Sequence, residues 1–194
     1  MRNKKSAWEE LSKKRNGTYG KSTFTKHENV IFQYKNTSIV LDRYTTMVGS
    51  TPIMNTRIRS IFKNPTRLSF KLYHEGFFSS LSKMLGMQDI LIGDDEFDQR
   101  FVVKSNDEIK IRQLLSDYKL KQLLFFGKPI TLEIKLKDKC LNSKDESILL
   151  YQATGVIKDI DTLENILNIF ERFIDHMIEI GLSNESQINS VLKP

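Results

Sequence analysis

The sequence has few of the residues that proteins use for covalent or metal-based stabilisation. Its 194 residues include one cysteine, Cys140, and three histidines. A single cysteine forms no disulfide within the chain. Neither Cys140 nor the widely separated His27, His74 and His176 follows the spacing of a zinc site. A chain of this length buries enough surface to fold without such a group, so we expect no metal and no cofactor.

Long hydrophobic runs are also absent. The sequence has no stretch of about 18 consecutive apolar residues, as a membrane-spanning helix would need. A basic N-terminus (Arg2, Lys4, Lys5) is followed at residues 8–15 by further charged residues, where a signal peptide would have its apolar segment. These absences predict a cytoplasmic protein with no membrane span.

Sequence motifs for catalysis and nucleotide binding are missing as well. Residues 20–23, Gly-Lys-Ser-Thr, look like the end of a phosphate-binding loop, but Arg15 stands where that loop needs a glycine. The flanking pattern is also reversed, because a helix precedes these residues and a strand follows them. No nucleophile elbow or dinucleotide-binding loop is present. We therefore predict no catalytic residue, and an enzyme whose groups meet only in three dimensions is an alternative.

What the chain does contain is a mixture of strand and helix patterns typical of an α+β protein. Alternating apolar residues indicate antiparallel strands in six stretches, residues 24–44, 53–62, 68–73, 101–104, 130–136 and 148–157. Helical spacing marks residues 6–14, 77–85, 107–126 and 161–180. We predict one domain over residues 1–194, with an antiparallel sheet of about seven or eight strands. The two main helical segments, 107–126 and 161–180, should pack on one face of it.

Capping patterns and periodicity refine this prediction. Ser105 with Glu108, and Asp161 with Glu164, have capping-box spacing, and Gly181 follows the last helix. Residues 182–194 should form a frayed tail. The expected core contains Phe32, Ile39, Leu41, Phe70, Leu72, Phe101, Val103, Leu114, Ile134, Leu150, Val156, Phe170 and Ile174.

Charge is distributed unevenly along the chain. Residues 1–75 hold 15 Lys and Arg against 5 Asp and Glu, whereas residues 76–194 hold 15 against 19. The strand-rich first half is therefore basic, and the helix-rich second half, 76–181, is slightly acidic. Nucleic acid binding is a second alternative, although the basic residues alternate with apolar ones and form no run. It predicts that one face gathers Lys21, Lys35, Arg43, Arg57, Arg59 and Lys71.

Two local features are candidate sites. An acidic cluster comprises Asp94, Asp95, Glu96 and Asp98. It lacks the spacing of a calcium-binding loop, so we interpret it as a solvated turn anchored by Phe97, with a metal or a basic partner as the alternative.

The second feature is the segment 74–87, which is rich in phenylalanine, leucine and methionine. It forms either a helix that caps one end of the sheet or an exposed surface for a partner. The contact residues in that second case would be Phe77, Phe78, Leu81, Met84 and Met87. On this basis we expect a non-catalytic binding or interaction domain whose partner is a protein or an apolar small molecule.

Two stretches of the chain resemble an uncharacterised family of bacterial proteins. The first runs Gly86-Met87-Gln88-Asp89-Ile90, then Ile92-Gly93-Asp94-Asp95-Glu96-Phe97-Asp98, then Phe101-Val102-Val103-Lys104-Ser105-Asn106-Asp107. The second is Tyr151-Gln152-Ala153-Thr154-Gly155. The resemblance implies a bacterial cytosolic protein, and it implies no activity and no catalytic residues.

Overall fold

The alternating strands join into one antiparallel sheet. The structure is a computed structural model that describes residues 6–23, 27–74, 88–126, 131–136 and 145–184. Across these residues nine strands follow one another in the order β1-β2-β3-β4-β9-β8-β5-β7-β6. Their bounds are β1 Thr18–Gly20, β2 Asn29–Tyr34, β3 Thr37–Val48, β4 Thr51–Lys63, β5 Phe70–His74, β6 Gln88–Asp89, β7 Phe101–Ser105, β8 Thr131–Leu136 and β9 Glu146–Thr154.

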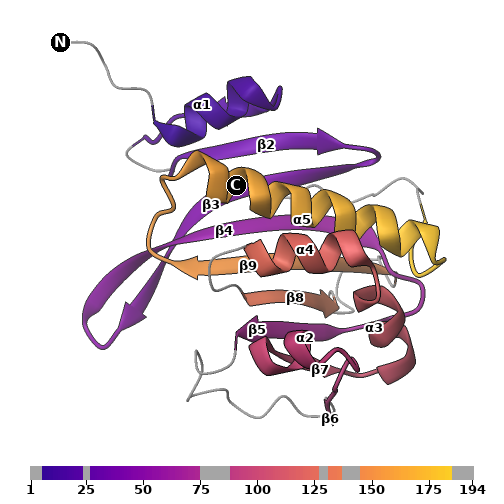
Figure 1. Cartoon of the computed structure of the whole chain (residues 1–194). Coiled ribbons are helices and arrows are strands. Elements are labelled where there is room, and N and C mark those ends of the chain that lie inside the picture. The colour runs from indigo at the N-terminus through magenta and orange to yellow at the C-terminus, as the bar shows by residue number, and fades with distance from the viewer. Residues whose placement is uncertain (1–5, 24–26, 75–87, 127–130, 137–144, 185–194) are drawn as a thin grey trace.

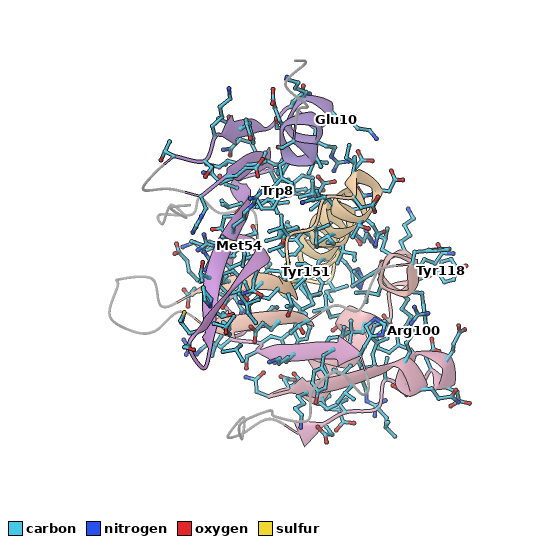
Figure 2. The ribbon with its side chains drawn as sticks, turned by 90° about the vertical axis from the view of Figure 1, so that its left-hand side faces the viewer. Trp8, Glu10, Met54, Arg100, Tyr118 and Tyr151 are labelled. Atoms are coloured by element: carbon cyan, nitrogen blue, oxygen red, sulfur yellow. The ribbon has the colours of Figure 1, made fainter. Side chains whose placement is uncertain are left out.

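Helices lie against one side of this sheet (Figures 1 and 2). They are α1 Ala7–Lys14, α2 Asp95–Arg100, α3 Glu108–Leu115, α4 Tyr118–Phe126 and α5 Ile160–Glu179. The longest, α5, runs across the sheet, with α1 and α4 as its neighbours. The α+β class, the antiparallel sheet and the helices on one face confirm the predicted fold. None of the described helices is long and apolar enough to cross a membrane.

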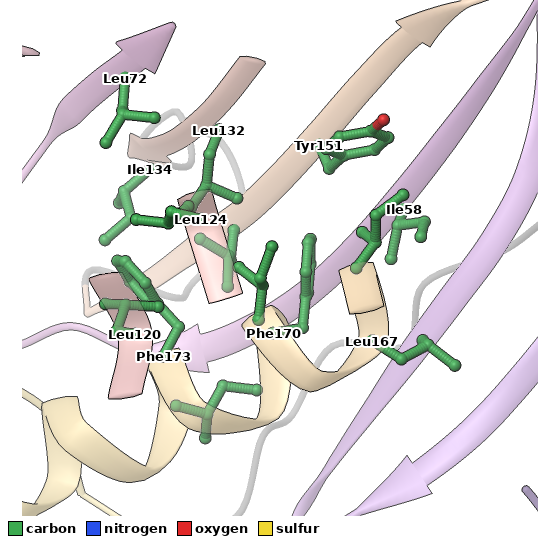
Figure 3. Close-up of a cluster of buried hydrophobic side chains, with 14 of the residues drawn as sticks. Ile58, Leu72, Leu120, Leu124, Leu132, Ile134, Tyr151, Leu167, Phe170 and Phe173 are labelled. Carbon is green, nitrogen blue, oxygen red and sulfur yellow. The ribbon is translucent and has the colours of Figure 1, made fainter. Parts of the chain in front are cut away.

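Side chains on the helix side of the sheet form the core. In β4, Ile58 faces the helices, and Arg57 and Arg59 therefore face the opposite side, because successive residues of a strand alternate. Figure 3 shows apolar side chains of α5, α4 and the central strands meeting between the two layers. The rings of Phe70 and Phe173 stack with centroids 5.4 Å apart, and both residues are fully buried.

The predicted core residues are buried with one exception. Val156 is only partly buried, because it lies beyond the end of β9 and packs against the rim of the core. Leu150 is buried, but it is not part of the main core cluster. Its neighbours Leu149 and Tyr151 are the β9 residues that face the helices, so Leu150 faces the other side.

Several element boundaries differ from those predicted. Residues 107–126 form two helices instead of one segment: the first ends at Leu115 with Ser116 as its C-cap, and Asp117 caps the second. The side chains that cap α3 and α5 are Asp107 and Asp159, whereas Ser105 and Asp161 were predicted. The acidic residues expected in a turn begin α2 instead. Gly181 takes a φ of +73° just after α5, as a helix-ending glycine should.

Candidate functional site

The most distinctive part of the surface is a hairpin arm formed by β3 and β4. These strands pair from Ile39 opposite Ser60 to Val48 opposite Thr51. The neighbouring strands pair with only part of this hairpin. Strand β2 pairs with β3 as far as Asp42, and β9 pairs with β4 as far as Thr56, followed by an isolated bridge at Asn55. Residues 45–54 of the hairpin extend beyond these neighbours and form the arm, which projects beyond the sheet in Figure 1.

The arm is exposed and carries no charge. Residues 45–52 are all exposed, and the side chains of Met47 and Val48 are each 62% exposed. No residue between Arg43 and Arg57 is charged, although charged residues make up 28% of the chain. An exposed stretch that has no charge and includes Met47 and Val48 is suited to contact with a partner, because charged residues keep most other protein surface solvated.

A tight turn closes the arm. Val48 pairs with Thr51, so the loop consists of Gly49 and Ser50 alone. Gly49 has a φ of +61°, and a type II′ turn requires glycine at this first loop position. Such a turn twists the two strands as a β-hairpin needs and holds the arm as a continuation of the sheet.

One edge of the arm is blocked and the other is open. Val48 and Thr51 flank the two-residue loop and form a hydrogen-bonded pair. Such pairs alternate with non-hydrogen-bonded pairs along an antiparallel ladder, so the main-chain N–H and C=O groups of residues 45, 47, 52 and 54 point outward, away from the other strand of the arm. On β4, Pro52 has no N–H, and the Met54 carbonyl accepts a hydrogen bond from the Gly155 N–H at 3.1 Å. On β3, the outward groups of Thr45 and Met47 have no partner among the residues that the structure describes.

Charged side chains form contacts on both faces of the root of the arm, which is the part of β3 and β4 where the arm joins the rest of the sheet. On the face away from the helices, the buried Asp42 carboxylate accepts hydrogen bonds from Nε and Nη2 of Arg57, both at 2.8 Å, and a further bond from Arg59. The Arg57 guanidinium also lies 5.1 Å from the ring centre of Tyr44, whose hydroxyl accepts a hydrogen bond from Gln152. Burial lowers the pKa of Arg59, and the Asp42 charge opposes that shift.

The helix-facing side of the root has a second network. Arg43 donates to the buried carboxylate of Glu28, and its guanidinium lies 4.9 Å from the ring centre of Trp8 on α1. Glu28 also accepts a hydrogen bond from Tyr19 at 2.8 Å. These contacts tie β3 to β1 and α1, so both faces of the arm's root are fixed to the body of the protein.

The predicted basic residues are brought together only in part. Arg57 and Arg59 share Asp42 on one face, while Arg43 lies on the other face. Lys35 pairs with Asp175 of α5 at 2.8 Å, Lys21 is exposed after β1, and Lys71 lies on β5.

Two residues of the acidic cluster, Asp94 and Asp98, accept hydrogen bonds from groups of the same chain. Asp94 caps α2 by accepting the Phe97 N–H at 3.2 Å, and Lys121 of α4 donates to it at 2.6 Å. The hydrogen bond from Lys121 lowers the pKa of Asp94. Asp98 accepts the N–H groups of Ile92 and Gly93, which closes the preceding turn.

Asp95 and Glu96 are exposed in the first turn of α2, and Phe97 is fully buried, as predicted. Within the described ranges, no group of three His, Cys, Asp or Glu side chains is placed to hold a metal ion. The predicted contact residues Phe77, Phe78, Leu81, Met84 and Met87 lie outside the described residues.

Sequence reasoning missed the arm. It recognised strands on either side of residues 45–52 and assigned no structure to that stretch. Two signals were available: the uncharged run between Arg43 and Arg57, and the Gly-Ser pair at its centre, which is typical of a two-residue hairpin loop.

Comparisons of the chain with protein-family models, with curated proteins and with solved structures return no match.

Proposed function

We propose that the protein is a non-catalytic interaction domain that binds a partner protein along the open edge of β3 in the arm. The carrying observation is the pair of outward main-chain groups at Thr45 and Met47, which have no partner among the described residues. In β-strand addition, an extended peptide pairs with such an edge. Its main-chain hydrogen bonds supply affinity, and the side chains beside the edge supply specificity.

The contrast between the two edges supports this interpretation. Proteins usually protect exposed strand edges with charge or proline, because an open edge invites pairing with other chains. Pro52 and the Gly155 bond protect the β4 edge, whereas the β3 edge has neither charge nor proline. The partner segment would be extended and largely uncharged, with apolar side chains that pack on Met47 and Val48.

Site-specific photocrosslinking tests the proposal. A benzophenone amino acid at Met47 should capture a defined partner in cells that naturally make the protein, and mass spectrometry identifies it. The same amino acid at Ile109, an exposed apolar position on α3, is the matched control and should give no such product. A crosslinked second copy of the chain would identify the partner as the protein itself.

A proline scan then distinguishes strand addition from nonspecific contact. Thr45→Pro removes an outward N–H that has no partner among the described residues, so the fold should survive and the crosslink at position 47 should disappear. Thr45→Ala keeps the N–H and should keep the crosslink. Absence of any product from position 47, or a product that Thr45→Pro leaves unchanged, would refute strand addition at this edge.

A further inference from the structure

A pocket of about 320 Å³ opens at the start of α5, far along the chain from the arm. Its described lining comes from three elements: Phe126 at the end of α4, Tyr151 of β9, and the first turns of α5 with the preceding residue Asp159. The volume is at the lower end of the range for sites that bind small molecules, and the lining mixes apolar and polar groups as those sites do.

Tyr151 is a polar residue of the pocket lining, and the residue as a whole is almost entirely buried. The residue is 2% exposed, and its hydroxyl has no hydrogen-bond partner among the described residues. Figure 3 shows the hydroxyl turned away from the core side chains Leu124 and Phe170. Burial raises the pKa of Tyr151, so the phenol stays protonated at neutral pH. A phenol hydroxyl can both donate and accept a hydrogen bond, so one that lines a pocket without a partner among the described residues is available to a ligand.

The helix end at this pocket is already occupied by its own cap. Asp159 accepts hydrogen bonds from the backbone N–H of Thr162, at 2.9 Å, and from the Thr162 hydroxyl. The N–H groups of a helix start attract anions only when they lack such a cap. Both charged residues of the described lining, Asp159 and Asp161, are carboxylates, so their charge repels an anion and attracts a cation.

The remaining lining groups fit an ammonium head on an apolar body. Asn165 donates its amide N–H to the Leu123 carbonyl at 3.0 Å, which leaves its own carbonyl oxygen as an acceptor. Asp161 is exposed and has no ion-pair partner within the described part of the chain. Phe126, whose side chain is 85% exposed, and Ile166 supply apolar surface, and an aromatic ring also attracts a cation.

We infer that this pocket binds a small organic cation, a primary amine on an apolar or aromatic body. The ammonium group lies against Asp161 and the Asn165 carbonyl, the body packs on Phe126 and Ile166, and the Tyr151 hydroxyl gains its hydrogen-bond partner from the ligand. The inference is independent of the arm, so either proposal can fail without the other.

Titration calorimetry on the full chain with phenethylamine tests the inference. Phenethyl alcohol and phenylacetate have the same ring and chain length with a neutral and an anionic end, respectively. We expect saturable 1:1 binding of the amine, weakened by added salt, and no binding of the other two. Failure of phenethylamine to bind saturably at millimolar concentration, or equal binding of all three, would overturn the inference.

Two variants test whether the amine binds in the pocket. Asp161→Asn should weaken phenethylamine about tenfold, the loss expected for one charge-assisted hydrogen bond at an exposed site. Asp95→Asn is the matched control, because Asp95 is an exposed aspartate in the first turn of α2 and is not part of the described lining, and affinity should not change. Equal effects of the two variants would show that the amine responds to net charge alone.

Tyr151→Phe tests the role of the hydroxyl separately. It removes one oxygen that has no partner in the described chain, so thermal stability should hold or rise. Affinity for phenethylamine should fall severalfold, as expected for a lost hydrogen bond. A clear loss of thermal stability together with unchanged affinity would show that the hydroxyl serves the fold and would remove Tyr151 from the site.

Discussion

Asp117 and Arg172 form a two-point ion pair that joins the start of α4 to α5. Arg172 Nε donates to one oxygen of the Asp117 carboxylate at 2.8 Å, and its Nη2 donates to the other at 2.5 Å. The same carboxylate accepts the Leu120 N–H at 2.7 Å, which caps α4. One side chain therefore both caps α4, just after α3 has ended, and holds α4 against α5.

Removal of Asp117 should destabilise the protein clearly. Asp117→Ala loses the helix cap and both hydrogen bonds from Arg172, and we expect a loss of about 2 kcal/mol in the free energy of unfolding. Urea denaturation measures it. Glu179→Gln removes the other carboxylate that contacts Arg172 and is the control. Because Glu179 is solvent-exposed, this change should have little effect. Similar midpoints for the two variants would contradict a special role of Asp117.

The same ion pair predicts a pH dependence. The hydrogen bonds from Arg172 hold the pKa of Asp117 below its usual value of 3.8. A carboxyl whose pKa is lower in the folded state stabilises the fold fully above the unfolded value and loses this contribution as the pH falls through the folded value. The difference in unfolding free energy between the wild type and Asp117→Asn should therefore be largest near pH 6 and should shrink below about pH 4. A constant difference from pH 6 to pH 2 would contradict this.

The stacked pair Phe70 and Phe173 should dominate the stability of the contact between α5 and β5. Both rings are fully buried, so Phe173→Ala removes their contact and leaves a cavity. We expect a loss of about 3–5 kcal/mol, measured by chemical denaturation. Phe173→Leu fills most of the space and should cost distinctly less. Equal losses for the two variants would mean that the surrounding side chains collapse around the site.

The sequence was most informative where periodicity is strong. Along α5, residues such as Leu167, Phe170 and Ile174 repeat at helical spacing, and each is buried against the sheet. It was misleading at the break between α3 and α4. Leucines 114, 115, 120 and 124 continue an apolar helical pattern through the break, whereas the new helix start is capped by Asp117, which is held by Arg172, 55 residues away. Contacts over such a separation leave no periodic signal in one sequence.

Local sequence patterns also fail to mark the two candidate sites. The pocket brings Phe126, Tyr151 and Asp161 together from three elements, and nothing local marks any of them as a pocket residue. The arm left a local signal, its uncharged run, but its open edge depends on where β2 and β9 end. Those ends are set by the pairing of strands, which local patterns do not specify.

Pro52 should be what keeps the second edge of the arm from pairing. Its missing N–H is directed outward from β4, so Pro52→Ala adds a main-chain donor there without changing the bonds to β3. We expect the variant to self-associate more strongly than the wild type in concentration-dependent light scattering, because the second edge of the uncharged arm then keeps only the Gly155 bond as protection. Ser50→Ala, in the turn of the same arm, changes no outward donor and should behave as the wild type. If Pro52→Ala also scatters as the wild type does, proline is not what protects that edge.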